Sequence, residues 1–346
     1  MPTALLTGSA GFFGSVLKRR LLNEGWTCVG IDLHEDPFVH ERWTTVRGDI
    51  RQREIVETIF KVTHIDCIFH CAAILAHDVS DQDFLWTSNV DGTEIIASTA
   101  SQHGVKHLVF ISSNCLWGSP VGHPIGEDEP PCPSEIYGRS KLAAEEMLQK
   151  YAGAMNIVTL RSTTIIDAGR LGLLAILFRF IDEGRRAWVV GKGDNRYQFI
   201  AAQDLATACI LAAAHDHSDT FNVGSDNVRS LADTYRTVIA TAGTRARVAS
   251  LPRAPTLAAM RLCHFLGISP LGPYHYKMIA EDFSFDTSRI KQVLGWKPSA
   301  ANEDVLTRAY QYYHEHKDDI AERTGDVSAH SRPARMGIIN LLRLLS

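Results

Sequence analysis

Three glycines near the start of the chain restrict its fold more than any other feature. The opening stretch reads TALLTGSAGFFGSVLKRRLLNEG, in which Gly8, Gly11 and Gly14 follow a short apolar run over residues 3–7. Apolar residues then recur at helical spacing until Gly25. The first glycine permits a tight turn, the second admits a pyrophosphate, and the third lets the helix pack against the strand. The N–H groups and the dipole at the helix start favour the phosphates.

An acidic residue extends this motif to a dinucleotide. A second strand-like run, TCVGID, ends at Asp32, 24 residues after Gly8. A carboxylate at this place binds ribose hydroxyls and repels a 2′-phosphate. We therefore expect NAD rather than NADP as the cofactor.

Alternating apolar runs and helical patterns continue to about residue 165. Further strands are expected at 43–50, 65–73, 106–113 and 156–162, and the clearest helices at 82–103 and 137–152. Such alternation predicts an α/β fold with a parallel, doubly wound sheet of the Rossmann type, with ligands at the carboxyl ends of the strands. Ser112, Ser113 and the pair Ala72–Ala73 stand at those ends.

The heptapeptide EIYGRSK, residues 135–141, places a tyrosine and a lysine one helical turn apart. On a helix that begins after Ser134 as N-cap, Tyr137 lies in the first turn and Lys141 on the same face. The helix dipole and a nearby ammonium both favour a phenolate, so this tyrosine is suited to acid–base work. The alternative is a surface helix with an ordinary tyrosine and a solvated lysine.

Composition excludes several classes of protein. The 346 residues are 45% hydrophobic and 21% charged, with a net charge of −4, which gives no reason to expect a nucleic-acid partner. No apolar run reaches the roughly 18 residues of a transmembrane helix, and the N-terminus does not resemble a signal peptide. Seven scattered cysteines, with Cys67 and Cys71 on one strand and outside any zinc spacing, fit a reduced cytoplasmic protein without a metal site.

In their combined order these motifs resemble the extended short-chain dehydrogenase/reductases. The motifs are TGxxGxxG, Asp32, Asp49, HCAA, Asn89 in NVDGT, SSNCLWG, YGRSK, NVGS and LGWKP, and the likeness covers about residues 3–315. This family includes sugar-nucleotide epimerases and dehydratases and the 3β-hydroxysteroid dehydrogenases. The resemblance implies a homodimer built from the helices near 82–103 and 137–152.

The resemblance also assigns roles to residues. Tyr137 becomes the catalytic acid and base, Lys141 its partner, Ser113 the hydroxyl that bonds the reacting oxygen, and Asn89 a support of the proton relay. The residues expected around NAD are Gly8, Gly11, Phe12, Phe13, Gly14, Asp32, Asp49, Ile50, Ala72, Ala73, Tyr137 and Lys141. The residues expected to contact the substrate are Ser113, Asn114, Thr163, Arg196 and Lys277.

Departures from the family pattern narrow the reaction. Dehydratases carry Asp-Glu after the small hydroxyl residue, whereas this chain has Asn114 and Cys115. Neither is a good proton donor, so dehydration is disfavoured.

The residues that grip a diphosphate are also changed. After the arginine of the sixth strand, epimerases often have an asparagine, but this chain has Thr163 and Thr164. Tyr197 occupies the place of a phosphate-binding arginine, with Arg196 one position earlier, and only Lys277 stands near the place of a second. One lysine grips a diphosphate less well than an arginine fork.

The second half of the chain is less regular. We expect a cofactor-binding domain over 1–165 that returns at 195–225, a substrate lobe from 166–194 and 226–315, and a tail over 316–346. Residues 251–278 are notably apolar, and two interpretations apply. They form an amphipathic helix packed on the smaller lobe with prolines at its ends, or a lid over an apolar substrate. The end of the tail, MGIINLLRLLS, is a candidate amphipathic helix that docks on the protein, a partner subunit or a membrane.

Three functions are compatible with these features. The first is NAD-dependent epimerisation of a nucleotide sugar through a transient ketone. The second is net oxidation or reduction of an apolar alcohol or ketone, as in the steroid branch of the family. The third is cofactor binding without turnover, which the intact set of Tyr137, Lys141 and Ser113 disfavours.

Overall fold

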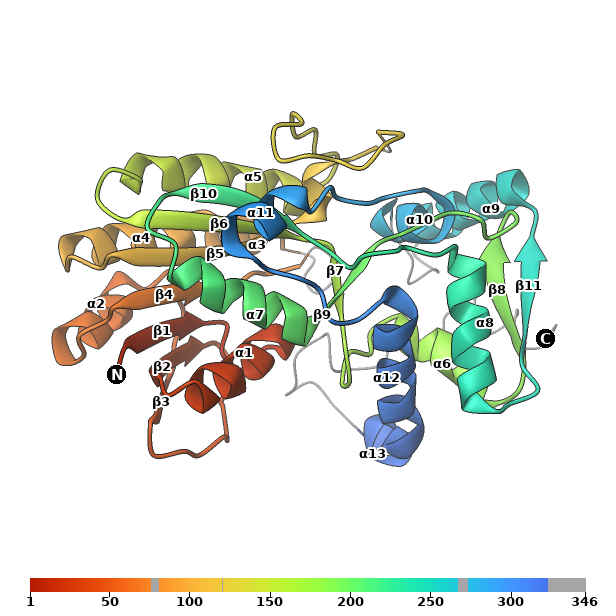
Figure 1. Ribbon diagram of the computed structural model, residues 1–346, viewed down its shortest axis with the longest axis horizontal. Helices are drawn as coiled ribbons and strands as arrows, with labels where there is room; N and C mark the ends of the chain where they lie inside the picture. Colours follow the sequence, from red (N-terminus) through yellow and green to blue (C-terminus); the bar gives the residue numbers. More distant parts are fainter. Residues whose placement is uncertain (76–80, 120, 267–272, 323–346) are drawn as a thin grey trace.

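A seven-stranded parallel sheet forms the larger half of the molecule (Figure 1). The computed structural model describes residues 1–75, 81–119, 121–266 and 273–322. The strand order is β10-β6-β5-β4-β1-β2-β3, and every neighbouring pair is parallel. The strands are β1 (Thr3–Thr7), β2 (Thr27–Asp32), β3 (Trp43–Arg47), β4 (Cys67–His70), β5 (His107–Ser113), β6 (Asn156–Ser162) and β10 (Asp219–Val223). The predicted fold class is confirmed.

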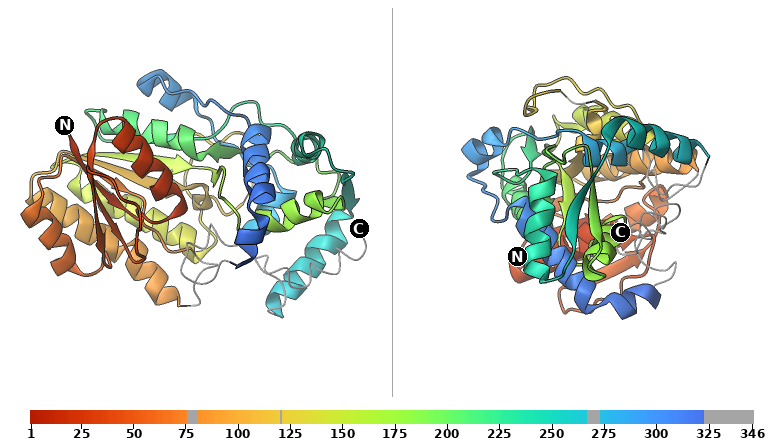
Figure 2. Two further views of the ribbon diagram at one scale, coloured as in Figure 1. Left: turned by 90° about the horizontal axis from the view of Figure 1, so that it is seen from below. Right: turned by 90° about the vertical axis from the view of Figure 1, so that its right-hand side faces the viewer.

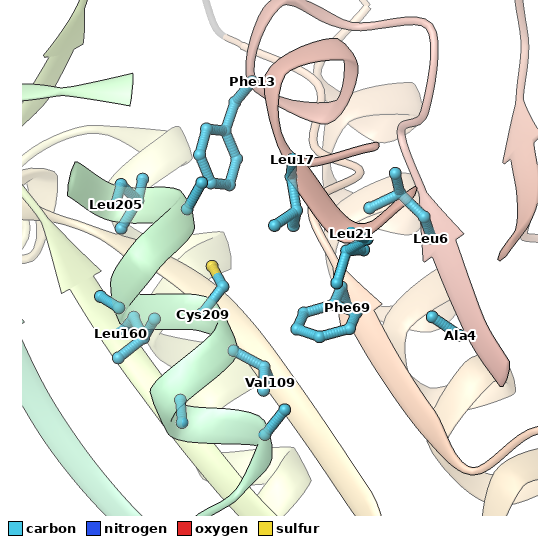
Figure 3. Packing of buried hydrophobic residues seen from close by; sticks show 14 of the residues in the cluster. Ala4, Leu6, Phe13, Leu17, Leu21, Phe69, Val109, Leu160, Leu205 and Cys209 are labelled. Carbon is cyan, nitrogen blue, oxygen red and sulfur yellow. The ribbon is translucent and has the colours of Figure 1, made fainter. Parts of the chain in front are cut away.

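Helices cover both faces of this sheet. Successive side chains on a strand point to opposite faces, and the strands carry apolar residues on both. Ala4 and Leu6 of β1 pack in one apolar cluster with α1 (Phe12–Asn23) and α7 (Ala202–Ala213). Figure 3 shows this cluster, with Leu17 and Leu21 of α1 near Phe69 of β4. Leu5 faces the other way, in a cluster with the helices α2 (Arg53–Val62), α4 (Asp91–Gln102) and α5 (Ile136–Leu148). The sheet is therefore buried on both sides, as a parallel sheet requires.

Two helices differ from the predicted ones. The helix expected over 82–103 is divided into α3 (Gln82–Asn89) and α4, with Val90 at the junction in a distorted right-handed conformation (φ −105°, ψ −64°). The helix expected over 137–152 consists of α5 followed by a short 3₁₀ turn, η2 (Gln149–Tyr151).

The predicted N-cap of α5 is wrong. Glu135, not Ser134, is the residue before the helix, and its side chain makes no capping hydrogen bond. The reason lies just upstream, where Cys132 N donates to Leu116 O and Gly118 N donates to Cys132 O. This pairing keeps the chain extended beyond Cys132, so the helix begins one residue later than the local sequence suggests.

A smaller unit, which we call the second lobe, lies beside the carboxyl edge of the sheet (Figures 1 and 2). Two short parallel pairs occur there, β7 (Thr164–Ile166) with β9 (Phe199–Ala201) and β8 (Arg186–Val190) with β11 (Arg247–Leu251). Its helices are α6 (Leu174–Asp182), α8 (Leu231–Ala242), α9 (Arg253–Phe265), α10 (Pro273–Ala280), α12 (Asn302–Glu315) and α13 (Lys317–Glu322), and α11 (Ser288–Leu294) lies against β10. Among the described residues, no helix is long and apolar enough to cross a bilayer.

Residues 251–278 contain two helices, α9 and α10. The prolines do mark helix starts, since Pro252 precedes α9 and Pro273 begins α10. However, no residue of α9 is buried, and Phe265 at its end is 86% exposed. A helix is thus present where one was predicted, and large apolar side chains also extend to its outward side.

Candidate active site

The glycine-rich turn is built as the sequence predicts. Gly8 has a positive φ of 71°, and a Cβ there would lie 2.8 Å from Ala72 N. A Cβ on Gly14 would lie 2.0 Å from Gly8 O, so only glycine lets α1 approach the turn this closely. Phe12 and Phe13 open α1 with buried rings, and their backbone N–H groups belong to the first turn, which has no intrahelical acceptors. The turn is thus shaped to present backbone donors at the edge of the sheet.

Asp32 lies beside this turn. Its Oδ2 accepts a hydrogen bond from Ala10 N at 3.0 Å, and its Oδ1 accepts one from His34 N at 2.9 Å. Both donors are backbone groups, so the carboxylate is held in place while each oxygen keeps a free lone pair. The carboxylate is therefore oriented for hydroxyl donors next to the glycine turn.

Asp49 is held by a neighbouring arginine. Its carboxylate accepts hydrogen bonds from the guanidinium of Arg51, with Nη2 at 2.6 Å from Oδ2. Burial acts to raise the pKa of Asp49, but the hydrogen bonds and charge of Arg51 outweigh it and lower that pKa below its ordinary value. Ile50 between them is buried, and a Cβ on Gly92 would meet its side chain at 2.8 Å. The predicted cofactor contact at Asp49 is thus already engaged with a protein cation.

A buried chain of hydrogen bonds lies under the end of β4. Ala72 N donates to Thr7 Oγ1, which lies 2.7 Å from His70 Nδ1, and His70 Nε2 lies 2.8 Å from Thr93 Oγ1. Thr93 Oγ1 in turn donates to Asn89 O. Burial, with a smaller contribution from the charge of Lys141, lowers the pKa of His70 to about 3. His70 is therefore a neutral structural residue, and Ala72 and Ala73 follow it at the strand end.

Asn89 connects this edge to α5. Its Oδ1 accepts from Ile74 N at 2.7 Å, and its Nδ2 donates to Ile74 O and to Ser140 Oγ, both at 3.0 Å. Ser140 Oγ then donates to Tyr137 O at 2.8 Å. Asn89 is 1% exposed, so its side chain holds the first turn of α5, which carries Tyr137, against the loop after β4.

A glycine inside the YGRSK motif brings α5 against the end of β5. A Cβ on Gly138 would lie 2.2 Å from Cys115 O, in the short 3₁₀ turn η1 (Asn114–Leu116) that follows Ser113. Half-buried Tyr137 precedes this glycine, and Lys141 lies one turn after the tyrosine. The structure therefore gathers the predicted catalytic residues at the carboxyl ends of β4 and β5.

Lys141 is a buried cation. Lys141 is only 2% exposed, and its Nζ lies 3.9 Å from the centre of the Phe110 ring. Burial lowers the pKa of Lys141 to about 7, although the charges of Glu145 and Cys71 act in the opposite direction. Among the described residues it has no hydrogen-bond acceptor, whereas buried polar groups generally have one. This ammonium is therefore available to a ligand with hydroxyl groups.

Ser113 is tied to the second lobe through its neighbour. Ser113 Oγ accepts from Cys115 N at 3.1 Å and donates to Asn114 Oδ1 at 3.4 Å. Asn114 Nδ2 then donates to Tyr197 OH at 2.8 Å. Tyr197, which occupies the place of a phosphate-binding arginine, is 2% exposed and packs against Phe199 and Phe283.

The remaining predicted substrate contacts differ in setting. Thr163 follows β6 and is 2% exposed, and its hydroxyl has no hydrogen-bond partner among the described residues. Arg196 is exposed, its backbone N donates to Asp282, and its guanidinium is 3.4 Å from Val228 O. The side chain of Lys277 lies outside the described part of the structure. A surface groove of about 510 Å³ between α8 and β11 contains none of the predicted site residues.

The sequence interpretation missed one pair beneath the site. Arg161 Nη2 lies 2.7 Å from Glu145 Oε2, both residues are less than 10% exposed, and Arg161 Nη1 donates to Glu127 O. The pair joins α5 to β6 one turn beyond Lys141. The arginine was visible in the sequence, but nothing there indicated that the glutamate on a separate helix faces it.

Comparison with known proteins defines the family. Residues 4–224 match the model of the NAD dependent epimerase/dehydratase family. The chain belongs to this family. It is 33% identical to the uncharacterized protein y4nG of Sinorhizobium fredii over 98% of this chain and 85% of that protein. It is 26% identical to the UDP-glucose 4-epimerase of Mycolicibacterium smegmatis over 89% of this chain and 97% of that one.

Solved structures of family members share the fold. The UDP-glucose 4-epimerase of Thermotoga maritima, determined with UDP-glucose, superposes with a TM-score of 0.76 at 20% identity over 91% of this chain and 99% of that one. The enzyme WbmG of Bordetella bronchiseptica, determined with NAD, gives 0.74 at 22% identity over 91% and 94%. Because it belongs to this family, the protein is an NAD-dependent enzyme. It also has the fold of these solved structures.

Proposed function

We propose that this enzyme is an NAD-dependent epimerase that inverts one carbon of a nucleotide sugar through a transient ketone. The observation that carries the proposal is the gathering of Tyr137, Lys141 and Ser113 at the edge beside the glycine turn. The full-length relative from Mycolicibacterium smegmatis is named for the same type of reaction. Tyr137 and Ser113 suit the removal of a proton from a hydroxyl whose carbon loses a hydride.

The residues present fit NAD. The glycine turn has no room for side chains where a pyrophosphate would rest, and buried Lys141 lacks an acceptor that ribose hydroxyls would supply. When bound, NAD supplies a nicotinamide that accepts a hydride from the substrate carbon and returns it. Gly8, Gly11 and Gly14 would hold its phosphates, and Asp32 its adenosine ribose.

The protein groups each have a defined task in this proposal. Tyr137 removes the hydroxyl proton during oxidation and returns it during reduction. Ser113 donates a hydrogen bond to the same oxygen as it becomes a carbonyl, which requires its hydroxyl to turn away from Asn114. Asn89 keeps the first turn of α5 in register, through Ser140 and Ile74. Asn114, an amide, offers no acid for the elimination of water.

A substrate panel tests the proposal. Purified protein is incubated with UDP-, GDP- and dTDP-sugars, and products are followed by NMR together with the absorbance at the NADH band. We expect one nucleotide sugar to convert to its epimer with no net change in NADH. Failure of every nucleotide sugar to bind or react would overturn the proposal.

One observation favours a second candidate, a dehydrogenase of an apolar alcohol. Tyr197 stands where a phosphate-gripping arginine is expected, and it is buried among aromatic rings rather than free to meet a charge. Such an enzyme would release NADH as it consumes an alcohol. The absorbance measurement of the substrate panel separates the two candidates directly.

The preference for NAD over NADP is also part of the proposal. Because Asp32 is fixed by Ala10 and His34 N–H groups, it cannot swing away from a 2′-phosphate. Titration of both cofactors should give tighter binding of NAD, and Asp32→Ala should reduce the difference by about tenfold. Equal binding of the two cofactors by the wild type would contradict this assignment.

Three further features remain proposals. We expect a homodimer formed through the helices near 82–103 and 137–152 (α3, α4 and α5) and a cytoplasmic location. We also expect a division into a cofactor domain over 1–165 and 195–225, a substrate lobe over 166–194 and 226–315, and a tail over 316–346. Sedimentation velocity tests the dimer, because the mass obtained for a dimer would be twice that of the monomer.

A further inference from the structure

The helix α9 presents an apolar face to solvent. Leu262, Phe265 and Leu266 are 57%, 86% and 57% exposed, which is unusual for three large apolar side chains on one helix. Ala254 and Ala258 precede Leu262 at intervals of four residues and are also exposed, so the face runs along the whole helix. The less exposed side, with Thr256, Leu257, Met260 and Cys263, faces the protein.

Apart from the thiol of Cys263, the ionisable residues of α9 are all basic. They are Arg253, Arg261 and His264, and all three are exposed. Neither guanidinium has a carboxylate partner among the described residues. Arg253 lies in the first turn, where the helix dipole disfavours a cation, so its position serves something other than the stability of this helix.

In the described part of the structure, the outward face of α9 is open to solvent. The helix contacts the protein through its inner side and through α10, where Tyr276 OH donates to Met260 O at 2.9 Å. Figure 1 shows α9 at the end of the molecule opposite α2 and β3, above β8 and β11 in this view. A flat partner could meet it without covering the carboxyl edge of the seven-stranded sheet.

We propose that α9 is an interfacial helix that docks the enzyme on an anionic lipid bilayer. A helix whose outward face is apolar and whose own charged side chains are cations matches a medium that is apolar inside and anionic at its boundary. In this arrangement Leu262, Phe265 and Leu266 enter the acyl boundary, and Arg253 and Arg261 meet the headgroups. Each such arginine contributes about a fivefold gain in partitioning, which corresponds to about 1 kcal/mol per basic residue at an anionic surface.

Vesicle flotation with the full-length protein tests the proposal. Vesicles of phosphatidylcholine alone are compared with vesicles that also contain phosphatidylglycerol. We expect wild type to float with the anionic vesicles, and Phe265→Glu to reduce partitioning by about tenfold or more. Arg261→Gln should reduce it by about fivefold.

A matched control isolates the face. Val62, at the end of α2, is 77% exposed, so Val62→Glu makes the same change of charge at a similarly exposed apolar residue on the other half of the molecule. It should leave partitioning unchanged. Because Phe265 and Val62 are both largely exposed, each variant should keep the wild-type melting temperature, which is measured in parallel.

Three results would overturn the proposal. The first is absence of wild-type protein from the anionic vesicles. The second is partitioning that Phe265→Glu leaves intact, which would assign it to another segment such as residues 323–346. The third is a self-association that Phe265→Glu abolishes in sedimentation velocity without lipid, which would assign the face to a second copy of the chain.

Discussion

Polar side chains at the carboxyl edge of the seven-stranded sheet are held more firmly than Arg196 of the second lobe. Along the sheet edge, Asp32 and Asn89 each have two or more hydrogen-bond partners from the protein. In the second lobe, Arg196 is exposed, and its guanidinium lies 3.4 Å from Val228 O. The first region is preorganised by the fold, whereas the second takes its order from what binds there.

This difference indicates that the fold fixes the geometry of the proposed catalytic groups at the sheet edge. In the proposed reaction, the reacting oxygen meets Tyr137 and Ser113 at a fixed geometry, and displacement of such groups lowers the reaction rate. Accordingly, the loops around them are locked by Gly138 and by Asn89. The binding of the rest of a substrate tolerates looser contacts. Substitutions at the sheet edge should therefore have larger effects than substitutions in the second lobe.

The largest effect is expected at the sheet edge. Tyr137→Phe should lower the turnover rate by about 10²–10⁴, because it removes the proton acceptor while it keeps the ring. Cofactor binding should change little. Tyr151→Phe, on the half-buried turn after α5, is the matched control and should turn over like wild type. Near-normal turnover of Tyr137→Phe would show that another group is the base.

Next in size is the support beneath the edge. Glu145→Ala should lower the free energy of unfolding by about 3–5 kcal/mol, because it leaves the buried guanidinium of Arg161 without its carboxylate. Glu24→Ala, which breaks the exposed pair with Arg20, should cost less than about 1 kcal/mol. Denaturant titration measures both, and similar losses for the two variants would mean that the buried pair does not anchor α5.

A pH-dependent effect is expected at Lys141. Its folded-state pKa of about 7 is below the ordinary value of 10.5, so the buried ammonium destabilises the cofactor-free fold fully below pH 7. That penalty shrinks as pH rises from 7 towards 10.5, where the unfolded lysine also becomes neutral. Lys141→Met should thus raise the free energy of unfolding, by on the order of 2 kcal/mol at pH 6 and by less at pH 9. A gain that does not depend on pH would contradict the lowered pKa.

The smallest effect is expected in the second lobe. Because the guanidinium of Arg196 is exposed, Arg196→Ala should weaken nucleotide-sugar binding by only about 0.5–1 kcal/mol. Arg247→Ala, an exposed arginine on β11, is the control and should leave it unchanged. Calorimetric titration measures the binding free energy of the nucleotide sugar for wild type and both variants. A loss above about 2 kcal/mol would show that the second lobe contains a formed phosphate site and would break the comparison.

The sequence predicted features that depend on local pattern. The parallel sheet and the glycine turn follow from apolar runs and from glycines, because these reflect backbone sterics and burial within one segment. The start of α5 was misplaced because the pairing of Cys132 with Leu116 is a contact between separate segments. For the same reason the pairing of Glu145 with Arg161 was not foreseen.

Within the candidate site, residue identities were easier to predict than partners. The sequence singled out Tyr137, Lys141 and Ser113, but not that Gly138 permits their approach or that Asn114 bonds to Tyr197. Helical spacing places two residues on one face, whereas such contacts depend on how two elements meet. Their roles in catalysis stay predictions.

The neutral state of His70 has a consequence for the way this enzyme responds to acidity. Imidazole is the side chain that ordinarily changes charge in the physiological range, yet this one has a pKa of about 3 and sits among hydroxyl groups. No positive charge therefore appears beneath Lys141 when a cell acidifies. His70 therefore does not change its charge between pH 5 and 8. Any inflection of activity in that range originates from groups other than this histidine.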